Sequence, residues 1–143
     1  MHIFLVRHGD AVPSLDDSKR SLSEEGRQQI IQLAQKIQEY GVIPARIVHS
    51  GILRAEQTAQ ILAEILNIQQ VEKIPGLKSS DAVETVLQEI PNWTQDTLLV
   101  SHLPYLAYLL GALVENSYHV QFDTGTAVCL ENLNSVWQVQ AVF

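Results

Sequence analysis

The chain has 143 residues, of which 46% are hydrophobic and 17% are charged, so a packed core and a single domain over residues 1–143 are expected. Nine Lys and Arg residues stand against 16 Asp and Glu residues, giving a net charge of −7, which leaves too few basic residues for a nucleic-acid-binding face. The single cysteine, Cys129, excludes an intrachain disulfide and a cysteine-rich zinc site.

The apolar segments are short, and this bears on location. No run approaches the 18 apolar residues of a membrane span, so no membrane association is expected. The start of the chain, MHIFLVRHG, has too short an apolar run for a signal peptide and lacks a basic segment before it. We therefore expect a cytoplasmic protein.

The first predicted elements are a strand, a loop and a helix. Residues 2–6 (HIFLV) form a buried strand by composition, and the polar stretch 10–23 after them is long for an internal loop, as functional loops often are. Ser21 and Glu24 have the spacing of a capping box, so a helix is expected from about there to Gly41. Its buried face is predicted to hold Ile30, Leu33, Ala34 and Ile37.

The middle of the chain repeats this alternation. Residues 46–49 (RIVH) predict a second strand, and a helix follows over 53–66 with Ala55, Ala59, Leu62 and Leu66 on one face. A short strand is expected over 71–74. A helix over 81–90 would have Asp81 and Glu84 as its capping pair and Pro91 after its end.

The last third begins with a buried strand and ends in an antiparallel pattern. Residues 97–101 (TLLVS) predict that strand, and Pro104 suits the first turn of a helix reaching Val114. Three further strands are expected, over 120–122, 127–131 and 136–142, the last two as a hairpin. Strand–helix alternation predicts an α/β fold, a three-layer α/β/α sandwich whose central sheet is mainly parallel with an antiparallel edge.

Two histidines stand at equivalent places in this topology. His8 follows the first strand and His102 follows the strand 97–101, so both are expected at the carboxyl edge of the sheet, where open α/β sheets bind ligands. Arg7 adjoins His8, and Arg54 lies in the first turn of the helix after the second strand. Guanidinium groups bind phosphate oxygens through two parallel hydrogen bonds, and imidazole serves as a nucleophile or a cation. The four residues together suit a phosphoryl group.

These residues occur in motifs that resemble a known family. Arg7-His8-Gly9 resembles the RHG signature of the histidine phosphatase superfamily, which has the phosphoglycerate-mutase-like fold. Residues 50–59 (SGILRAEQTA) look like its second motif, and Ser101-His102 after three apolar residues look like its third. The segments RHGDA, LSEEG, LRAEQT and VSHLP are similar to SixA-type phosphohistidine phosphatases across nearly the whole chain.

The resemblance implies a role for each residue. His8 would be the nucleophile that becomes phosphorylated, and Arg7, Arg54 and His102 would hold the phosphoryl oxygens. An attacking His8 must be neutral, with its other ring nitrogen bonded to a carbonyl near Gly9, and a protonated His102 would add a third positive charge. The implied substrate is phosphohistidine on a signalling protein, such as a histidine-containing phosphotransfer domain. Inorganic phosphate would be the product, and no metal or organic cofactor is expected.

A general acid is harder to place. Larger members of the superfamily carry an acidic proton donor, and the candidates in this chain are Asp10, beside the RHG motif, and Asp81, which also suits a helix cap. Neither is assigned. An imidazole leaves from a P–N bond readily once its ring is protonated, whereas an alkoxide needs a proton donor, so a missing acid favours phosphohistidine over an ester.

The remaining polar residues have weaker signals. Ser50 and Ser101 are possible supports, Ser50 as a helix cap and Ser101 at a strand end. Lys19 and Arg20 suit either a solvated loop or a contact with an acidic partner. A metal site of His8, His102 and an aspartate lacks any recognised ligand spacing.

Three functions remain open from the sequence. A phosphohistidine phosphatase is favoured. A small phosphate-ester phosphatase would need an acid near the leaving group. A phosphate- or phosphohistidine-binding module with little turnover would need the two arginines and His102 but not His8 as nucleophile.

Overall fold

The computed structural model describes residues 1–115 and 119–143. One six-stranded sheet runs through it, in the order β3-β2-β4-β1-β5-β6. The strands are β1 (His2–Arg7), β2 (Arg46–His49), β3 (Gln70–Lys73), β4 (Thr97–Ser101), β5 (Ala127–Leu133) and β6 (Val136–Val142). The first four strands are mutually parallel, and β5 and β6 add an antiparallel edge beside β1. This is the predicted α/β class.

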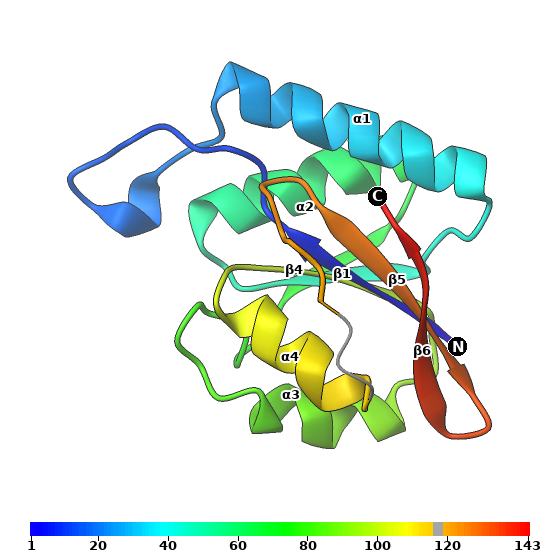
Figure 1. The fold of residues 1–143 in the computed structure, drawn as a ribbon. Coiled ribbons are helices and arrows are strands. Elements are labelled where there is room, and N and C mark those ends of the chain that lie inside the picture. The colour runs from blue at the N-terminus through cyan, green and yellow to red at the C-terminus, as the bar shows by residue number, and fades with distance from the viewer. Residues whose placement is uncertain (116–118) are drawn as a thin grey trace.

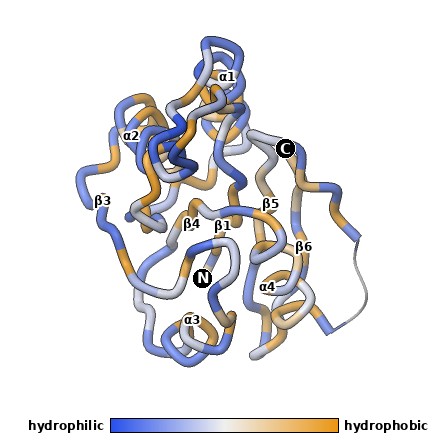
Figure 2. The backbone as a smooth tube through the Cα atoms, turned by 90° about the vertical axis from the view of Figure 1, so that its left-hand side faces the viewer, coloured by the Kyte–Doolittle hydropathy of each residue, from blue (hydrophilic) through white to orange (hydrophobic). Residues whose placement is uncertain are grey.

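Helices cover both faces of the sheet (Figure 1). The α-helices are α1 (Glu24–Tyr40), α2 (Leu53–Leu66), α3 (Glu84–Glu89) and α4 (Tyr105–Leu113), and the 3₁₀ turns are η1 (Asp17–Lys19) and η2 (Ile90–Asn92). Figure 2 shows α1 and α2 on one side of the sheet and α3 and α4 on the other. Among the described residues, no helix has both the length and the apolar character needed to cross a membrane.

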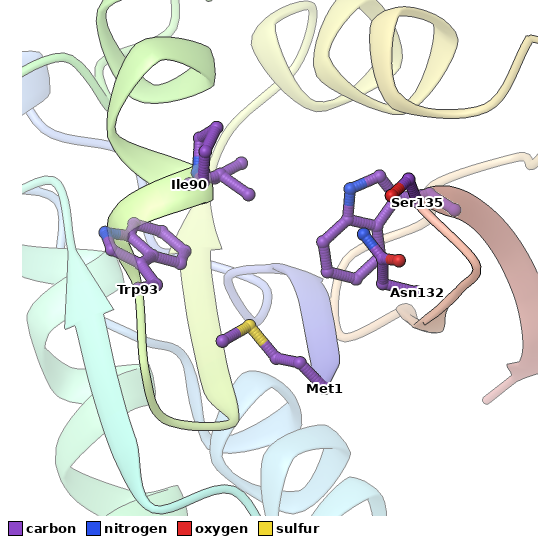
Figure 3. A pocket seen from close by; sticks show the side chains of 7 residues that line it. Met1, Ile90, Trp93, Asn132 and Ser135 are labelled. Atoms are coloured by element: carbon purple, nitrogen blue, oxygen red, sulfur yellow. The ribbon is translucent and has the colours of Figure 1, made fainter.

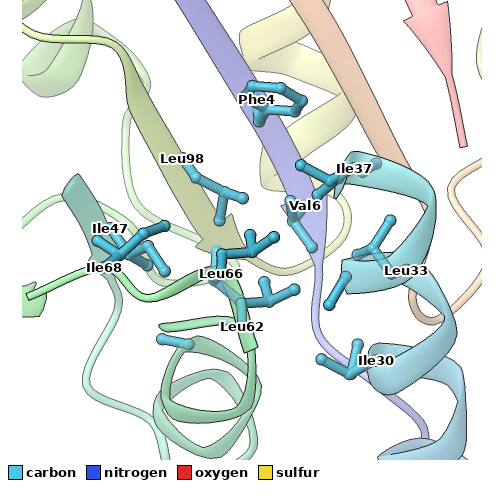
Figure 4. Packing of buried hydrophobic residues seen from close by; sticks show 14 of the residues in the cluster. Phe4, Val6, Ile30, Leu33, Ile37, Ile47, Leu62, Leu66, Ile68 and Leu98 are labelled. Atoms are coloured by element: carbon cyan, nitrogen blue, oxygen red, sulfur yellow. The ribbon is translucent and has the colours of Figure 1, made fainter. Parts of the chain in front are cut away.

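Alternation along the strands divides the core into two layers. Phe4 and Val6 of β1 face α1 and α2, whereas Ile3 and Leu5 face α4. Figure 4 shows the first layer, in which the predicted apolar faces of α1 and α2 meet the sheet. All eight predicted core positions of these two helices are buried: Ile30, Leu33, Ala34, Ile37, Ala55, Ala59, Leu62 and Leu66. The prediction of these two helical faces is confirmed.

The predicted stop of α1 at Gly41 is confirmed, but the two predicted N-terminal capping pairs are wrong. Helix α1 begins at Glu24 with Ser23 as its cap, whose hydroxyl accepts a hydrogen bond from the Gly26 N–H at 2.9 Å, so Ser21 and Glu24 form no capping box. Helix α3 begins at Glu84 after Val83, and the Asp81 carboxylate instead accepts from the Lys78 N–H at 2.8 Å. In the second case a turn at Lys78 uses the carboxylate that the motif needed.

The strand predicted over 120–122 is absent from the structure, where these residues are irregular. The backbone here bonds to the end of β1 rather than to a strand ladder. The Phe122 carbonyl accepts from Arg7 Nη1 at 2.8 Å, and the Gly125 N–H lies 3.1 Å from the Arg7 carbonyl and 3.0 Å from the His8 carbonyl. The segment therefore supports the two residues that follow the sheet.

Gly26 offers a test of this packing, because a Cβ there would overlap the Asp10 carbonyl oxygen. We expect Gly26→Ala to lower the free energy of unfolding by roughly 3 kcal/mol, although alanine is the better helix former. Gly111→Ala in α4 is the matched control, because nothing lies within 4 Å of a Cβ there. Urea unfolding of both variants measures the difference, and equal stability would contradict the close approach of α1 to the loop.

Candidate active site

The carboxyl edge of the parallel sheet gathers the predicted site. Arg7 ends β1 and pairs in register with Ser101, which ends β4, so His8 and His102 follow neighbouring strands. Strand β2 lies on the other side of β4, and Ser50 follows it. The rings of His8 and His102 have centroids 5.0 Å apart. Strand order thus brings together residues separated by about a hundred positions.

His8 has the orientation that a nucleophile needs. Its Nδ1 lies 2.8 Å from the Gly9 carbonyl, to which it donates, so the unprotonated Nε2 is left for reaction. Arg54 Nε donates to this Nε2 at 3.4 Å. Burial lowers the pKa of His8 to about 4, assisted by the positive charges of Arg54 and Arg7 and opposed by the bond to Gly9. The imidazole is therefore neutral near pH 7.

Backbone carbonyls hold the side chains of both Arg7 and Arg54 in place. Arg7 donates from Nη1 to the Phe122 carbonyl, and its Nε is buried without a partner among the described residues. Burial lowers the Arg7 pKa, with Asp123 acting against this. Arg54, in the first turn of α2, is held by the loop before α1, as its Nη1 donates to the Asp17 carbonyl at 2.8 Å.

Thr58 explains why a threonine follows Arg54 by one helical turn. Its hydroxyl donates to the Arg54 carbonyl at 2.8 Å and accepts from the Gly9 N–H at 3.1 Å. A Cβ on Gly9 would lie 2.8 Å from the Gly26 carbonyl oxygen. The glycine of RHG and the threonine of the second motif together fix the backbone that positions His8.

Burial favours the neutral form of His102 in the free site, so the third positive charge that a protonated ring would add is absent near pH 7. Burial lowers its pKa to about 3, with further contributions from the charges of His8 and Arg54. Its Nε2 lies 2.7 Å from the Ser50 hydroxyl, which accepts from the Ile52 N–H at 3.3 Å. Ser50 can therefore donate its own proton to Nε2, which leaves the ring proton on Nδ1, a buried atom with no partner among the described residues.

The predicted supports have specific contacts. The Ser101 hydroxyl donates to the Leu77 carbonyl at 2.5 Å, which ties β4 to the loop after β3. Ser50 is not the cap of α2, whose cap position is Ile52 and has no side-chain bond. His49 is buried, and its Nδ1 accepts from the Gly51 N–H at 3.1 Å, so it shapes the turn before Arg54.

Of the acidic residues, Asp17 lies in the site. Asp10 accepts a hydrogen bond from the Ser23 hydroxyl at 2.7 Å, and Asp81 accepts from the backbone at Lys78. Asp17 Oδ2 instead lies 3.2 Å from Arg54 Nη2, and this guanidinium lowers the carboxyl pKa. Sequence reasoning missed Asp17. The length of the loop 10–23 was the available signal. It predicted a functional loop but did not point to Asp17.

Other candidates lie outside this cluster. Lys19 is exposed with its Nζ 3.9 Å from Asp16, whereas Arg20 donates to the Val12 and Ala11 carbonyls and so braces the loop. His119 is exposed, and Cys129 is buried in the core as predicted. Within residues 1–115 and 119–143, no three His, Cys, Asp or Glu side chains are grouped to hold a metal ion.

Two of the cavities in the structure differ in their distance from the site. A cavity of about 510 Å³ lies at the opposite edge of the sheet, where Met1, Ile90, Trp93, Asn132 and Ser135 surround it (Figure 3). It contains none of the site residues. A cleft of about 330 Å³ instead adjoins the site through Ser50, and its remaining lining is Gly51, Ile52, Lys73, Ile74, Pro75 and Lys78.

The two lowered histidine pKa values predict a pH effect on stability. A histidine in the unfolded chain has a pKa of about 6.5, whereas in the folded protein the pKa is about 4 for His8 and about 3 for His102. Between these values the unfolded chain binds protons that the folded site does not, so lowering the pH favours unfolding. We therefore expect the thermal midpoint to fall as pH drops from about 7 to 5. His8→Gln should reduce this dependence and His119→Gln should not. An unchanged slope in His8→Gln would contradict the assignment.

Comparison with known proteins identifies the fold family. Residues 3–84 match the histidine phosphatase superfamily (branch 1). The chain is 32% identical to phosphohistidine phosphatase SixA of Escherichia coli (strain K12) over 87% of this chain and 81% of that protein. A solved structure of the protein histidine phosphatase SixA complexed with tungstate superposes with a TM-score of 0.90 at 28% identity, covering 99% of this chain and 96% of that one.

A more distant structural neighbour shows that the fold alone does not specify a substrate. A putative alpha-ribazole-5'-P phosphatase from Escherichia coli has a TM-score of 0.79 at 18% identity, over 99% of this chain and 96% of that one. The substrate in its name is a phosphate ester, so this architecture does not by itself select a phosphohistidine. The sequence match and the architecture agree, and the chain belongs to the histidine phosphatase superfamily.

Proposed function

We propose that residues 1–143 form a single histidine phosphatase domain that removes the phosphoryl group from phosphohistidine on a protein, through a phosphorylated His8. The observation that carries the proposal is the state of His8: a neutral ring, its Nδ1–H bonded to the Gly9 carbonyl and its Nε2 directed at the Arg54 guanidinium. A nucleophile with a free electron pair beside a fixed cation is suited to attack an anionic phosphorus centre.

The first step forms a bond between His8 Nε2 and phosphorus as the bond from phosphorus to the substrate nitrogen breaks. Arg7 and Arg54 supply positive charge for the phosphoryl oxygens. Arg7 Nε and His102 Nδ1, which have no partner within residues 1–115 and 119–143, supply donors. A buried donor without a partner costs roughly 1–3 kcal/mol, so an incoming oxyanion relieves that cost. In the second step water attacks phospho-His8 and releases inorganic phosphate. Side chains alone carry both steps.

The substrate class follows from the proton donors. Asp10 and Asp81 are engaged elsewhere, and Asp17 is ionised because Arg54 lowers its pKa. An alkoxide leaving group would therefore lack a donor among these three carboxyl groups, whereas a protonated imidazole leaves as a neutral molecule. This supports phosphohistidine over phosphate esters, in agreement with the substrate named for the SixA relatives.

A protein partner such as a histidine-containing phosphotransfer domain suits the surroundings of the site. The cleft beside Ser50 carries the exposed Lys73 and Lys78, in a chain whose net charge is −7. An acidic patch around the partner's phosphohistidine would find complementary charge there. We propose a cytoplasmic location, which the single buried Cys129 favours because extracellular domains of this size are often disulfide-bonded.

The test compares substrates under one set of conditions. Purified protein is given a phosphohistidine-carrying phosphotransfer domain and, separately, a panel of phosphate esters. We expect dephosphorylation of the domain with a kcat/KM at least about 100-fold above that for any ester. Efficient hydrolysis of one ester would overturn the substrate class and favour the small-molecule phosphatase. Binding of both substrates without turnover would favour the binding module.

A further inference from the structure

The loop between β1 and α1 carries a carboxylate onto the site. In Figure 1 this loop, coloured blue, projects beyond the end of β1 and contains η1. Asp17 is the first residue of η1, and Arg54 donates to both its main-chain carbonyl, at 2.8 Å, and its Oδ2, at 3.2 Å. Asp17 thus binds the same guanidinium whose Nε bonds to the nucleophile.

The position of Asp17 is built by the fold. Asp16 caps η1 by accepting from the Ser18 N–H at 3.0 Å, and Arg20 ties the end of the turn back to the Ala11 and Val12 carbonyls. A bridge between Ala11 and Leu22 closes the base of the loop. The backbone that carries the Asp17 carboxylate is therefore held in place by an ordered turn.

The exposures of the two partners define the outward direction. The Arg54 side chain is 10% exposed and the Asp17 side chain 73%, so Asp17 lies on the solvent side of the guanidinium. His8 Nδ1 is tied inward to the Gly9 carbonyl, and Nε2 is the reacting atom. In-line displacement places the leaving group on the far side of phosphorus from Nε2. Because Nε2 faces Arg54 Nε and Asp17 lies on the solvent side of Arg54, we infer that the leaving group departs past Asp17.

A fixed negative charge at that place separates two kinds of leaving group. A protonated phosphoimidazole still has partial positive charge on its ring in the transition state, and a carboxylate attracts it. A phosphate ester develops negative charge on its leaving oxygen, and the same carboxylate repels it. The interaction acts on kcat/KM, because free substrate in water does not experience it.

We propose that Asp17 is a specificity-determining residue that favours substrates whose leaving group is a protonated imidazole and disfavours those that leave as an oxyanion. This rests on the proposed function and names the group behind its substrate preference. During the reaction the His8–phosphorus bond forms, the phosphorus–imidazole bond breaks with its electron pair on the leaving nitrogen, and the proton on the other ring nitrogen stays in place. Neutral imidazole departs, and Asp17 neither gives nor takes a proton.

The experiment measures Asp17→Asn, which retains the shape of the side chain and the main-chain carbonyl that binds Arg54. Asp16→Asn is the control, because it removes a neighbouring exposed carboxylate that contacts Ser18 and Lys19 rather than Arg54, and asparagine keeps the oxygen that caps η1. Both are assayed on phosphoimidazole and on p-nitrophenyl phosphate, with inorganic phosphate as a competitive inhibitor. We expect kcat/KM for phosphoimidazole to fall about tenfold in Asp17→Asn while the value for the ester stays level or rises, as a single nearby charge allows.

Inhibition by inorganic phosphate provides the second readout. Removing the carboxylate frees Arg54 Nη2 and removes a like charge, so phosphate should bind several-fold more tightly to Asp17→Asn than to the wild type. A merely structural role would weaken all three ligands together. Equal changes for both substrates, or the same change in Asp16→Asn, would overturn the proposal. Wild-type enzyme inactive on both phosphoimidazole and a phosphohistidine-carrying phosphotransfer domain would instead overturn the proposed function.

Discussion

Replacing His8 with alanine is expected to abolish turnover, lowering kcat by at least about 10⁴-fold, as loss of a covalent nucleophile does in other enzymes. The Phe122 and Asp17 carbonyls anchor Arg7 and Arg54 independently of His8, so the anion site should survive loss of the Arg54–His8 contact. Inorganic phosphate should therefore bind to the variant within a few-fold of its wild-type affinity. Steady-state assays and calorimetric titration with phosphate measure the two quantities.

Two controls accompany the measurements on His8→Ala. The thermal midpoint shows whether the variant is folded, and His119→Ala, which changes an exposed histidine, should keep full activity. Turnover within tenfold of wild type in a folded His8→Ala would contradict the covalent mechanism, and loss of phosphate binding together with turnover would contradict the separate anchoring of the arginines.

Arg54 gives the second large effect. Arg54→Ala removes the cation beside Nε2 and is expected to lower kcat/KM by about 10²–10³-fold, comparable with loss of one oxyanion donor. Arg54→Lys should recover little of this, because an ammonium group cannot reach His8 Nε2 and both Asp17 oxygens at once.

The control for this substitution is an arginine elsewhere on the sheet. Arg46→Lys changes a residue that starts β2, pairs with Glu72 at 3.1 Å and lies over the Trp93 ring. It should leave kcat/KM unchanged. An Arg54→Lys enzyme with near wild-type kcat/KM would show that charge alone suffices and would contradict a role for the guanidinium geometry.

The fold and the central residues could be predicted because each rests on a local pattern with one geometric consequence. Buried apolar runs that alternate with amphipathic helices specify a parallel sheet, and residues after parallel strands must share one edge. Residues that follow β1 and β4 therefore had to lie at the same edge, and Arg54 joined them because α2 begins there. That His8 and His102 are neighbours depends on the pairing of β1 with β4, which no local pattern specifies.

The errors came from contacts between segments far apart in sequence. Residues 120–122 have strand-like composition, but the Phe122 carbonyl accepts from Arg7 and the nearby Gly125 N–H bonds to the Arg7 and His8 carbonyls. Asp17 lies in a loop whose path depends on Arg20 and on the Ala11–Leu22 bridge, which no periodicity reveals. The neutral state of His102 follows from burial next to positive charge, which appears only in the folded chain.

The most direct test of the account follows the phosphoryl group through a single turnover. A radiolabelled phosphohistidine protein is mixed with a stoichiometric amount of enzyme, the reaction is stopped in alkali within milliseconds to seconds, and labelled peptides are mapped. The account predicts that label appears on His8 while it leaves the substrate, then passes to inorganic phosphate, and that no label appears on His8→Ala. Label on a residue other than His8 would contradict it. So would an enzyme that is never labelled and forms free phosphate as fast as the substrate is lost.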